Sequence, residues 1–567
     1  MRTWGASGAA AAIRRSQAAS AQARLTGCGI DEAGELVHER VSRRRFLWGT
    51  GAAVVAAAPV LAGSSAAADP RRRVARRESV ARHQSGRVAI FGSGISGLGC
   101  AYRLWVKHGI TASVYEYNAL PGGRIRTLRG FFDDDQLVEE HAEFVNPEHT
   151  ATLALARSLS LSLDNTDEYP SGTHPKDETL RFQGKPWSQK QVNADWHDWG
   201  WKLFHDAAFV TAPWPQLYNN NNPGGRELDR MSVSEWIDKN IPGGMASDFG
   251  ALCVSATLDE FGGPPEEQSA LNLVYLLGED DSRSDGFQPR VTPVLAGADE
   301  KWHIHGGTDL LISGLIDRLP AGTVGLGQEL VALRAGASGG YTCTVQSGAT
   351  TTEVTADHVV LALPFTRLRS IDLSGLDIDP LHLRAIAVEP LGSNAKFFVQ
   401  CSSRVWNHPD GADGNAYCGG VVQGAWDPTA YQAGTAGILA ALPGGSIGQN
   451  WGSRYGLTTY RGSPPEAMTG DYLHQFNQLF PGVSDAYNGR SFYVWSTGDP
   501  HILGAYSYLK VGQYTAFNGI QGQREDNLHF AGEQTSVNFQ GYIEGGLLSG
   551  YRCADEIVGK RVPLDDL

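Results

Sequence analysis

The segment VAIFGSGISGLGCAYRLWVKHGITASVYE, residues 88–116, decides the fold of this chain. Residues 88–91 form a short apolar run of the size of a strand buried in a parallel sheet, and residues 112–115 form a second one that ends at Glu116. The glycine-rich sequence of residues 92–97 lies between them and opens a helical stretch that runs to about His108. This order predicts a βαβ unit with a dinucleotide-binding fingerprint.

Each part of the fingerprint has a physical task. Gly92 permits a tight turn, Gly94 lets a pyrophosphate approach the backbone, and Gly97 lets the helix pack closely on the strand. The N–H groups at the start of the helix, with Ser93 and Ser96 in the same loop, are expected at the phosphates. Glu116 lies about 20 residues further on, where an acid accepts hydrogen bonds from a ribose.

A second glycine pair follows, in Gly122-Gly123-Arg124-Ile125-Arg126-Thr127. Its backbone N–H groups and the Arg124 cation suit the same diphosphate. The combination of GSGISGL, the ribose acid and GGRIRT resembles the flavin-containing amine oxidases, and the resemblance covers residues 86–560. It implies FAD as the dinucleotide.

The resemblance also implies an α/β fold, with an FAD-binding Rossmann-like domain and a discontinuous mixed α+β substrate domain. We expect residues 86–150, 301–365 and 515–567 in the FAD-binding domain. Residues 151–300 and 366–514 are expected in the substrate domain, because residues 164–300 are rich in Trp, Asp and Asn and residues 366–514 alternate as strands do.

Further cofactor contacts are implied at both ends of the chain. Besides Gly123 and Arg124, they are Ala142, Glu143, Phe144, Leu330, Glu533, Gly541, Tyr542 and Ile543. A helix predicted from about Gly541 would direct its N-terminal N–H groups at the flavin, where they stabilise negative charge on the reduced ring.

The resemblance assigns catalytic roles to four residues, Lys396, Tyr506, Tyr542 and Trp495. Lys396 is expected to hold a water against the flavin and to assist the reaction with oxygen, although a lysine of an edge strand is the alternative interpretation. Tyr506 and Tyr542 are expected to flank the substrate nitrogen in a narrow, dry slot, with Trp495 on the same wall; core tyrosines are the alternative. Residue 505 is Ala where some family members carry a flavin-linking Cys, so FAD should be non-covalent.

The residue type at position 143, a glutamate, bears most directly on the class of substrate. Many L-amino acid oxidases of the family have an Arg there to bind the substrate carboxylate, whereas an acid repels a carboxylate and attracts a second ammonium group. This favours a monoamine, diamine or polyamine. Another Arg, such as Arg290 or Arg404, is the alternative anchor for a carboxylate, and Glu143 may instead contact flavin or a structural partner.

The implied reaction is the oxidation of a primary or secondary amine to an imine, which hydrolyses, with O2 reduced to H2O2. An L-amino acid oxidase is the nearest alternative, and a flavin desaturase or porphyrinogen-type oxidase is a more distant one. A flavoprotein without catalytic activity is a further alternative, against which Lys396, Tyr506 and Tyr542 argue.

The N-terminal region has the pattern of an export signal. Ser42-Arg43-Arg44-Arg45-Phe46-Leu47 is a twin-arginine motif, followed by a mildly apolar run that ends in three alanines at residue 68. We expect a signal peptide over residues 1–68, a linker over 69–85, and export by the twin-arginine machinery to the periplasm or the medium; a membrane anchor is the alternative. Translation from Val41 is a further hypothesis, because the charged region before the motif is long.

Charge and cysteine content restrict the partners. Loss of residues 1–68 removes eight Arg and four acidic residues and changes the net charge from −14 to −18, which argues against nucleic acid. The six cysteines after residue 68 show no metal-binding spacing, so no metal is expected, and their pairing stays open. The oligomeric state also stays open, with a homodimer as one option.

Overall fold

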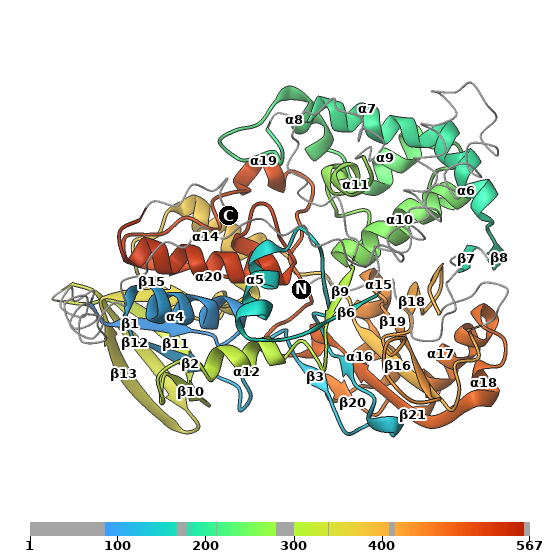
Figure 1. Ribbon diagram of the computed structural model, residues 1–567. Helices are drawn as coiled ribbons and strands as arrows, with labels where there is room; N and C mark the ends of the chain where they lie inside the picture. The colour runs from blue at the N-terminus through green and yellow to red at the C-terminus, as the bar shows by residue number, and fades with distance from the viewer. Residues whose placement is uncertain are drawn as a thin grey trace, which may run out of the picture.

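The computed structural model describes residues 86–166, 179–182, 184–210, 213–278, 300–337, 339–407 and 414–560. The predicted signal peptide, the linker, the Val41 start and Arg290 lie outside the described residues. Within these ranges one part of the chain is built on a parallel sheet, and the other on a second sheet and a group of helices (Figure 1). They are called the cofactor side and the substrate side, after the domains that the sequence predicts there.

The central element is β1 (Val88–Phe91), which pairs in parallel with strands on both sides. The sheet has five strands in the order β10-β2-β1-β14-β22. The other four are β2 (Ala112–Glu116), β10 (Val324–Leu326), β14 (His358–Leu361) and β22 (Leu528–Phe530). All the pairings are parallel and β1 is fully buried, so the predicted α/β fold is confirmed.

Two long helices, α4 (Ile95–His108) and α20 (Ile543–Ile557), pack against each other beside this sheet (Figure 1). A Cβ at Gly550 would overlap the α4 backbone at Ser96, so the small residue permits close packing of the two helices. Arg103 and Asp555 join them by an ion pair of 2.6 Å.

A four-stranded sheet adjoins this unit in the order β13-β12-β11-β15. Its strands are β11 (Glu329–Ala335), β12 (Tyr341–Ser347), β13 (Thr350–Ala356) and β15 (Asp372–Gly375). Because β15 pairs with β11, residues 372–375 belong to the cofactor side, although the sequence placed them in the substrate domain. Helix α13 (Phe365–Leu368) precedes β15 in the chain, and helix α14 (Pro380–Val388) follows it.

The substrate side contains an eight-stranded sheet in the order β20-β21-β16-β19-β18-β17-β7-β8. In chain order its strands are β7 (Thr179–Phe182), β8 (Lys185–Pro186), β16 (Lys396–Cys401), β17 (Ala416–Cys418), β18 (Gly424–Trp426), β19 (Gly437–Ala441), β20 (Arg461–Gly462) and β21 (Tyr487–Val494). Strand β16 lies between β21 and β19, so Lys396 is not on an edge strand.

Side chains of β16 alternate between two apolar clusters. Phe397 and Val399 pack toward α16 (Trp451–Tyr455), α17 (Glu466–Leu479) and α18 (Val483–Ala486), whereas Phe398 packs with Trp426 on the other face. The short helix α15 (Gly445–Gln449) precedes α16.

A helical group covers the remaining side of the substrate region (Figure 1). It consists of α6 (Gln189–Asp195), α7 (Trp201–Phe209), α8 (Pro223–Asp229), α9 (Val233–Asn240), α10 (Asp248–Phe261) and α11 (Ala270–Leu277). Helix α9 begins at the capping box of Ser232 and Glu235. Helix α10 ends at Gly262, which adopts the left-handed conformation of a C-cap.

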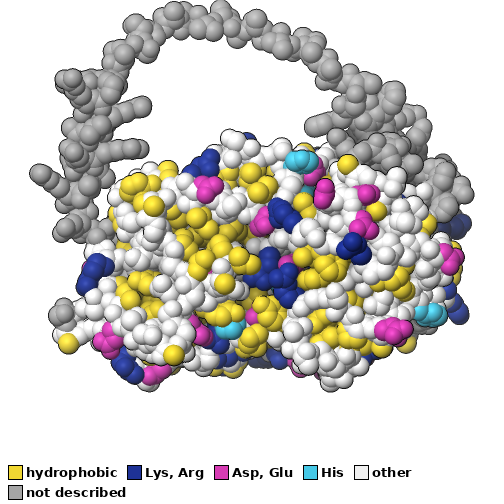
Figure 2. Space-filling model, turned by 90° about the horizontal axis from the view of Figure 1, so that it is seen from below, with side chains coloured by type: hydrophobic (Ala, Val, Ile, Leu, Met, Phe, Trp, Pro, Cys, Tyr) yellow, Lys and Arg dark blue, Asp and Glu magenta, His cyan; other side chains and the backbone are white. Residues whose placement is uncertain are grey.

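Smaller elements complete the description of the fold. Short strands and helices such as β5 (Phe144–Val145), β9 (Trp302–Ile304), α5 (Thr150–Ser158) and α12 (Leu310–Ile316) connect the two sides. Figure 2 shows charged side chains of both signs among hydrophobic ones on the lower face. Among the described helices, none has the length and apolarity of a membrane span, and the described residues hold no cluster of potential metal ligands. The six described cysteines are buried and unpaired with one another.

Candidate active site

Two helix N-termini converge at one edge of the parallel sheet. Helix α4 follows β1 and helix α20 follows β22, and since these strands run parallel, both helices begin at the same edge. In the described chain neither N-cap, Gly94 or Tyr542, makes a side-chain capping bond. The first N–H groups of both helices are therefore donors for an anion at this edge.

The two predicted glycine loops contact each other here. The Gly122 N–H donates to the carbonyl of Ser93 at 3.0 Å. Gly92 has a φ of +104°, and a Cβ at Gly97 would overlap the carbonyl oxygen of Gly92, so both positions need glycine. At Gly94 the space is open, because the nearest atom to an added Cβ is 3.8 Å away, on Gly122. This opening lets a diphosphate approach the backbone.

Glu116 stands beside the loop, buried at the end of β2. Its Oε2 accepts from the backbone N–H and from the hydroxyl of Ser93, both at 2.8 Å, and its Oε1 accepts from the Asn118 N–H at 2.9 Å. A carboxylate has further acceptor positions, so these bonds orient Glu116 and still leave it able to accept from a ribose.

Glu533 links the glycine loop with the C-terminal segment. Its Oε1 accepts from Arg124 at 2.9 Å and from the Ser507 N–H at 3.1 Å, and its Oε2 accepts from the Ser507 hydroxyl and the Gly541 N–H. Burial by itself raises the pKa of Glu533, but Arg124 and the Ser507 hydroxyl outweigh burial and lower the pKa to about 2. The residue is therefore an anion held by four hydrogen bonds, and Arg124 also donates to the carbonyl of Ala505 at 2.7 Å.

Lys396 and Glu143 form a buried ion pair. The Lys396 Nζ lies 2.6 Å from Glu143 Oε2 and 3.0 Å from the carbonyl oxygen of Glu139. The other oxygen of Glu143 accepts from the Trp426 indole at 3.0 Å, and the ammonium group lies 5.2 Å from the centre of the same ring. Two of the three N–H donors of Lys396 are used in this way, and among the described residues the third meets no acceptor.

This pairing changes the interpretation of Glu143. The sequence suggested that its carboxylate attracts a second ammonium group of the substrate, but the charge of Glu143 is already matched by Lys396. The alternative of a structural partner describes what the structure shows. A substrate cation would have to displace a buried lysine, which is unfavourable.

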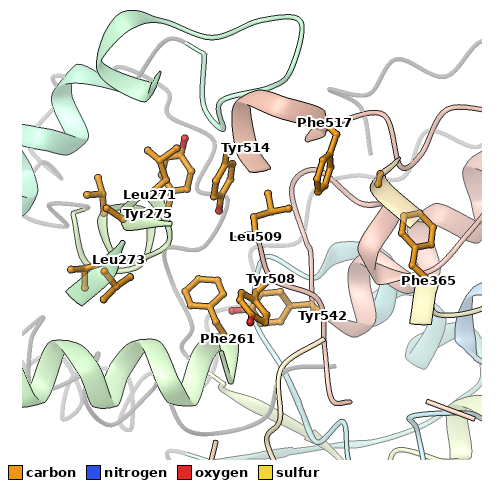
Figure 3. Close-up of a cluster of buried hydrophobic side chains, with 14 of the residues drawn as sticks. Phe261, Leu271, Leu273, Tyr275, Phe365, Tyr508, Leu509, Tyr514, Phe517 and Tyr542 are labelled. Atoms are coloured by element: carbon orange, nitrogen blue, oxygen red, sulfur yellow. The ribbon is translucent and has the colours of Figure 1, made fainter. Parts of the chain in front are cut away.

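Helix α10 holds the two tyrosines expected around the substrate nitrogen. The Tyr506 hydroxyl donates to the carbonyl oxygen of Asp259, and the Tyr542 hydroxyl donates to Glu260 Oε1 at 2.9 Å. Both rings are buried. Figure 3 shows Phe261, at the end of the same helix, beside Tyr508 and Tyr542. Consecutive residues of one helix therefore bring together tyrosines that are 36 positions apart in the sequence.

The other predicted contacts are distributed around this centre. The Ala142 N–H donates to the Arg124 carbonyl at 3.1 Å, and Ile543 is the first buried residue of α20. Phe144 begins β5, and Leu330 is buried in β11. Ala142 and Ile543 belong to one apolar cluster, whereas Phe144 packs with Phe398 and Trp426 in another. Leu330 lies on the second sheet.

Trp495 and Arg404 are each held by contacts within the substrate side. Trp495 packs against the cluster that contains Phe397, and its indole donates to the Gly448 carbonyl at 3.0 Å. Its place on the wall beside Tyr506 stays a prediction. Arg404, an alternative anchor for a carboxylate, is bound to Asp427 and to the Thr429 carbonyl.

Sequence reasoning did not select Asp259, Glu260 or Ser507. The first two lie at the C-terminal end of an apolar helix, where acids oppose the helix dipole, and this was the signal that could have marked them. Ser507 follows Tyr506 and could be found only through its tertiary contact with Glu533.

The comparisons with known proteins agree with this geometry. Residues 95–558 match the family model of the flavin containing amine oxidoreductases. The chain belongs to this family. Flavin-containing amine oxidase B of Sus scrofa is 24% identical over 510 residues, which are 85% of this chain and 88% of the relative. The flavin-containing amine oxidase of Danio rerio is 24% identical over 488 residues, with 83% and 85% covered.

Solved structures share the fold. Cyclohexylamine oxidase from Brevibacterium oxydans has a TM-score of 0.68 at 21% identity and covers 84% of this chain and 99% of its own. Wild-type putrescine oxidase bound to putrescine has a TM-score of 0.66 at 18% identity, with the same coverage. The protein is thus a flavin-dependent amine oxidoreductase, and the open glycine cradle with two uncapped helix N-termini fits FAD.

Proposed function

We propose that the protein oxidises a small amine to an imine with non-covalently held FAD, and that O2 is reduced to H2O2. The observation that carries this proposal is the placement of Tyr506 and Tyr542. Their hydroxyls donate to adjacent residues of α10, and Tyr542 is the N-cap residue of α20. When bound, FAD would accept hydride from the substrate carbon and return the electrons to oxygen.

The residues of this chain would provide binding, orientation and charge. Gly94, Gly123 and Arg124 would hold the diphosphate, and Glu116 the ribose, as the sequence predicts. The tyrosine pair would orient the amine and exclude water, because both rings are buried and their hydroxyls are already bonded. Lys396 would offer its remaining N–H to the flavin region, where its positive charge favours the reduction of oxygen.

The charges around the site support an amine over an L-amino acid. Arg404 is fully engaged with Asp427 and backbone carbonyls, so it does not offer its guanidinium to a carboxylate. The buried Glu260 accepts from the Tyr542 hydroxyl, and an acid at this position disfavours a substrate carboxylate beside the ring. An L-amino acid oxidase is therefore the second candidate, and it requires an arginine other than Arg404 to bind the carboxylate.

The test follows flavin absorbance without oxygen while amines or L-amino acids are added. We expect amines to bleach the flavin, and we expect Tyr542→Phe to slow bleaching by about tenfold or more, because the ring loses its bond to Glu260. Tyr487→Phe, on β21, is the matched control. Bleaching by L-amino acids alone would overturn the proposed substrate class, and no bleaching by either would overturn the reaction. Release of the flavin on denaturation would support non-covalent binding.

Export by the twin-arginine route remains part of this proposal. It is supported by the motif at residues 42–47 and by a cofactor that must bind before a folded protein is exported. Replacement of Arg43 and Arg44 by Lys should retain the full-length protein in the cytoplasm, as measured by cell fractionation. Unchanged export of this variant would contradict it.

A further inference from the structure

His303 is a buried histidine that lies between two carboxylates. It belongs to β9 and is 1% exposed. Its Nε2 lies 3.1 Å from Glu139 Oε1, and its Nδ1 lies 3.6 Å from Asp164 Oδ2. A neutral imidazole has one N–H, whereas an imidazolium has one for each of the two carboxylates. The position of the ring therefore favours its protonated form.

The surrounding charges keep His303 protonated. Burial by itself lowers the pKa of His303, but Asp164 and Glu139 outweigh burial, and with the charge of Glu143 they raise the pKa to about 9. Glu139 is the matching anion. Burial by itself raises the pKa of Glu139, but His303 and the donors of Thr308 outweigh burial and lower it. His303 and Glu139 therefore form an ion pair at neutral pH.

Two further titratable side chains lie next to this pair. The ring centre of Tyr431 is 5.0 Å from that of His303, and burial raises the pKa of Tyr431 well above its usual value, so the phenol stays neutral. The side chain of His305 is 65% exposed and lies 2.9 Å from the other oxygen of Asp164. Asp164, on β6 (Leu163–Asn165), thus connects the buried imidazolium with the surface.

Glu139 links His303 to Lys396. The Glu139 carboxylate faces His303, and the carbonyl oxygen of the same residue accepts from Lys396 Nζ at 3.0 Å. Strand β5 pairs with β9, so that Phe144 lies opposite His303. Glu143, the other partner of Lys396, directly precedes Phe144. Both partners of the lysine therefore belong to a short segment that His303 contacts at each end.

The imidazolium balances the charge of this buried group. Glu139 and Glu143 carry two negative charges, and Lys396 supplies one positive charge. Protonated His303 supplies the second. Its deprotonation would leave a net negative charge beside the lysine, and this charge would oppose the reduction of oxygen, because O2 gains negative charge as it takes up electrons.

We propose that protonated His303 is a positioning residue for Lys396, which holds the segment of its two partners, balances their charge and thereby speeds the reaction of the reduced flavin with oxygen. This inference rests on the proposed function, in which Lys396 favours oxygen reduction. In that reaction O2 takes up two electrons from the reduced flavin and two protons and becomes H2O2. His303 contributes charge and position, and it exchanges no atom or electron with oxygen.

The experiment measures the reoxidation of the flavin without any substrate. The flavin-loaded enzyme is reduced with one equivalent of dithionite and mixed with O2 in a stopped-flow instrument, from about pH 7 to about pH 10.5. We expect the reoxidation rate constant of the unmodified enzyme to fall by about tenfold as the pH rises past about 9, because His303 loses its proton there.

His303→Gln separates the charge from the hydrogen bond. The Gln amide places a donor close to the position of the histidine Nε2 but has no charge. Its reoxidation should be about tenfold slower than that of the unmodified enzyme at neutral pH and should show no decline near pH 9, with unchanged flavin content. Asp164→Asn removes one of the two carboxylates and should move the decline to lower pH. The exposed His474→Gln on α17 is the matched control and should keep the profile of the unmodified enzyme.

The outcomes separate this inference from a structural role and from the proposed function. A reoxidation rate without a decline near pH 9, or a decline that persists in His303→Gln, would overturn the inference. If His303→Gln does not retain flavin, Asp164→Asn decides, because a decline at an unchanged pH would also overturn it. If amines do not bleach the flavin but reoxidation behaves as expected, the proposed amine oxidation fails and the role of His303 stands. If amines bleach the flavin and reoxidation does not depend on His303, only the inference fails.

Discussion

Two buried carboxylates of this protein have opposite surroundings. Glu533 accepts four hydrogen bonds, one of them from Arg124, and its pKa is lowered to about 2. Asp259 is equally buried but accepts none from the described residues, and burial raises its pKa. The first carboxylate is completed by a buried arginine, whereas the second meets no described cation, and burial disfavours its charge.

The difference separates a charge that assembles the site from an acid whose charge the fold does not compensate. A carboxylate that joins Arg124, Ser507 and Gly541 ties the glycine loop to the start of α20 and so shapes the cofactor site. A buried carboxyl without a cation beside it is destabilising in its charged form, so burial favours the neutral acid. The Lys396–Glu143 pair belongs to the first kind, because its two charges complete each other.

The largest effect is expected for Glu533→Gln. Loss of the charge leaves Arg124 buried beside a neutral amide, and we expect a loss of about 3 kcal/mol in unfolding free energy together with loss of bound flavin. Because the folded pKa of Glu533 lies below its unfolded value, this stabilisation is present above about pH 4.5 and is lost as the pH falls toward 2. Denaturant titrations at several pH values measure the unfolding free energy, and the flavin-to-protein absorbance ratio measures the bound flavin.

The exposed Glu466→Gln on α17 provides a matched control and should change neither quantity. If the Glu533→Gln variant is as stable as the unmodified protein and binds as much flavin, the charge of Glu533 does not stabilise the cofactor site, and the contrast with Asp259 fails.

A smaller net effect is expected when both members of the second pair are replaced. Lys396→Met and Glu143→Gln should each lower the unfolding free energy by about 3 kcal/mol, since each leaves a buried charge alone. The double variant should recover about 1–3 kcal/mol of the summed loss, as measured by a double-mutant cycle. Strict additivity of the two losses would show that the ion pair is not formed.

The smallest effect on stability is expected for Asp259→Asn. The substitution removes a charge that has no partner, so the unfolding free energy at neutral pH should stay within about 1 kcal/mol of the unmodified value or rise. Since the folded pKa of Asp259 is raised, the unmodified protein should gain stability relative to this variant as the pH falls toward 3.8. A loss of several kcal/mol, comparable to that of Glu533→Gln, would assign Asp259 to the architecture.

The cofactor side was predicted well because its signals are local. The glycine spacing of residues 92–97, the strand before it and Glu116 after it are read within about 30 residues, and the structure shows the parallel sheet that they predict. The substrate side was predicted less well. Residues 372–375 pair with the cofactor side and Glu143 pairs with Lys396, because each outcome depends on contacts between distant segments.

The sequence by itself determined the dinucleotide fold, the two glycine loops and the tyrosines of the C-terminal segment, since short-range spacing of glycine, apolar and acidic residues carries that information. Only the tertiary structure decided which charges meet. Lys396 reaches Glu143 across 253 positions, whereas Asp259 is carried by α10 to a sheet face where no described side chain completes it. A charge has no partner in a sequence until folding brings one within a few ångströms, because electrostatic and hydrogen-bonding interactions act at that range.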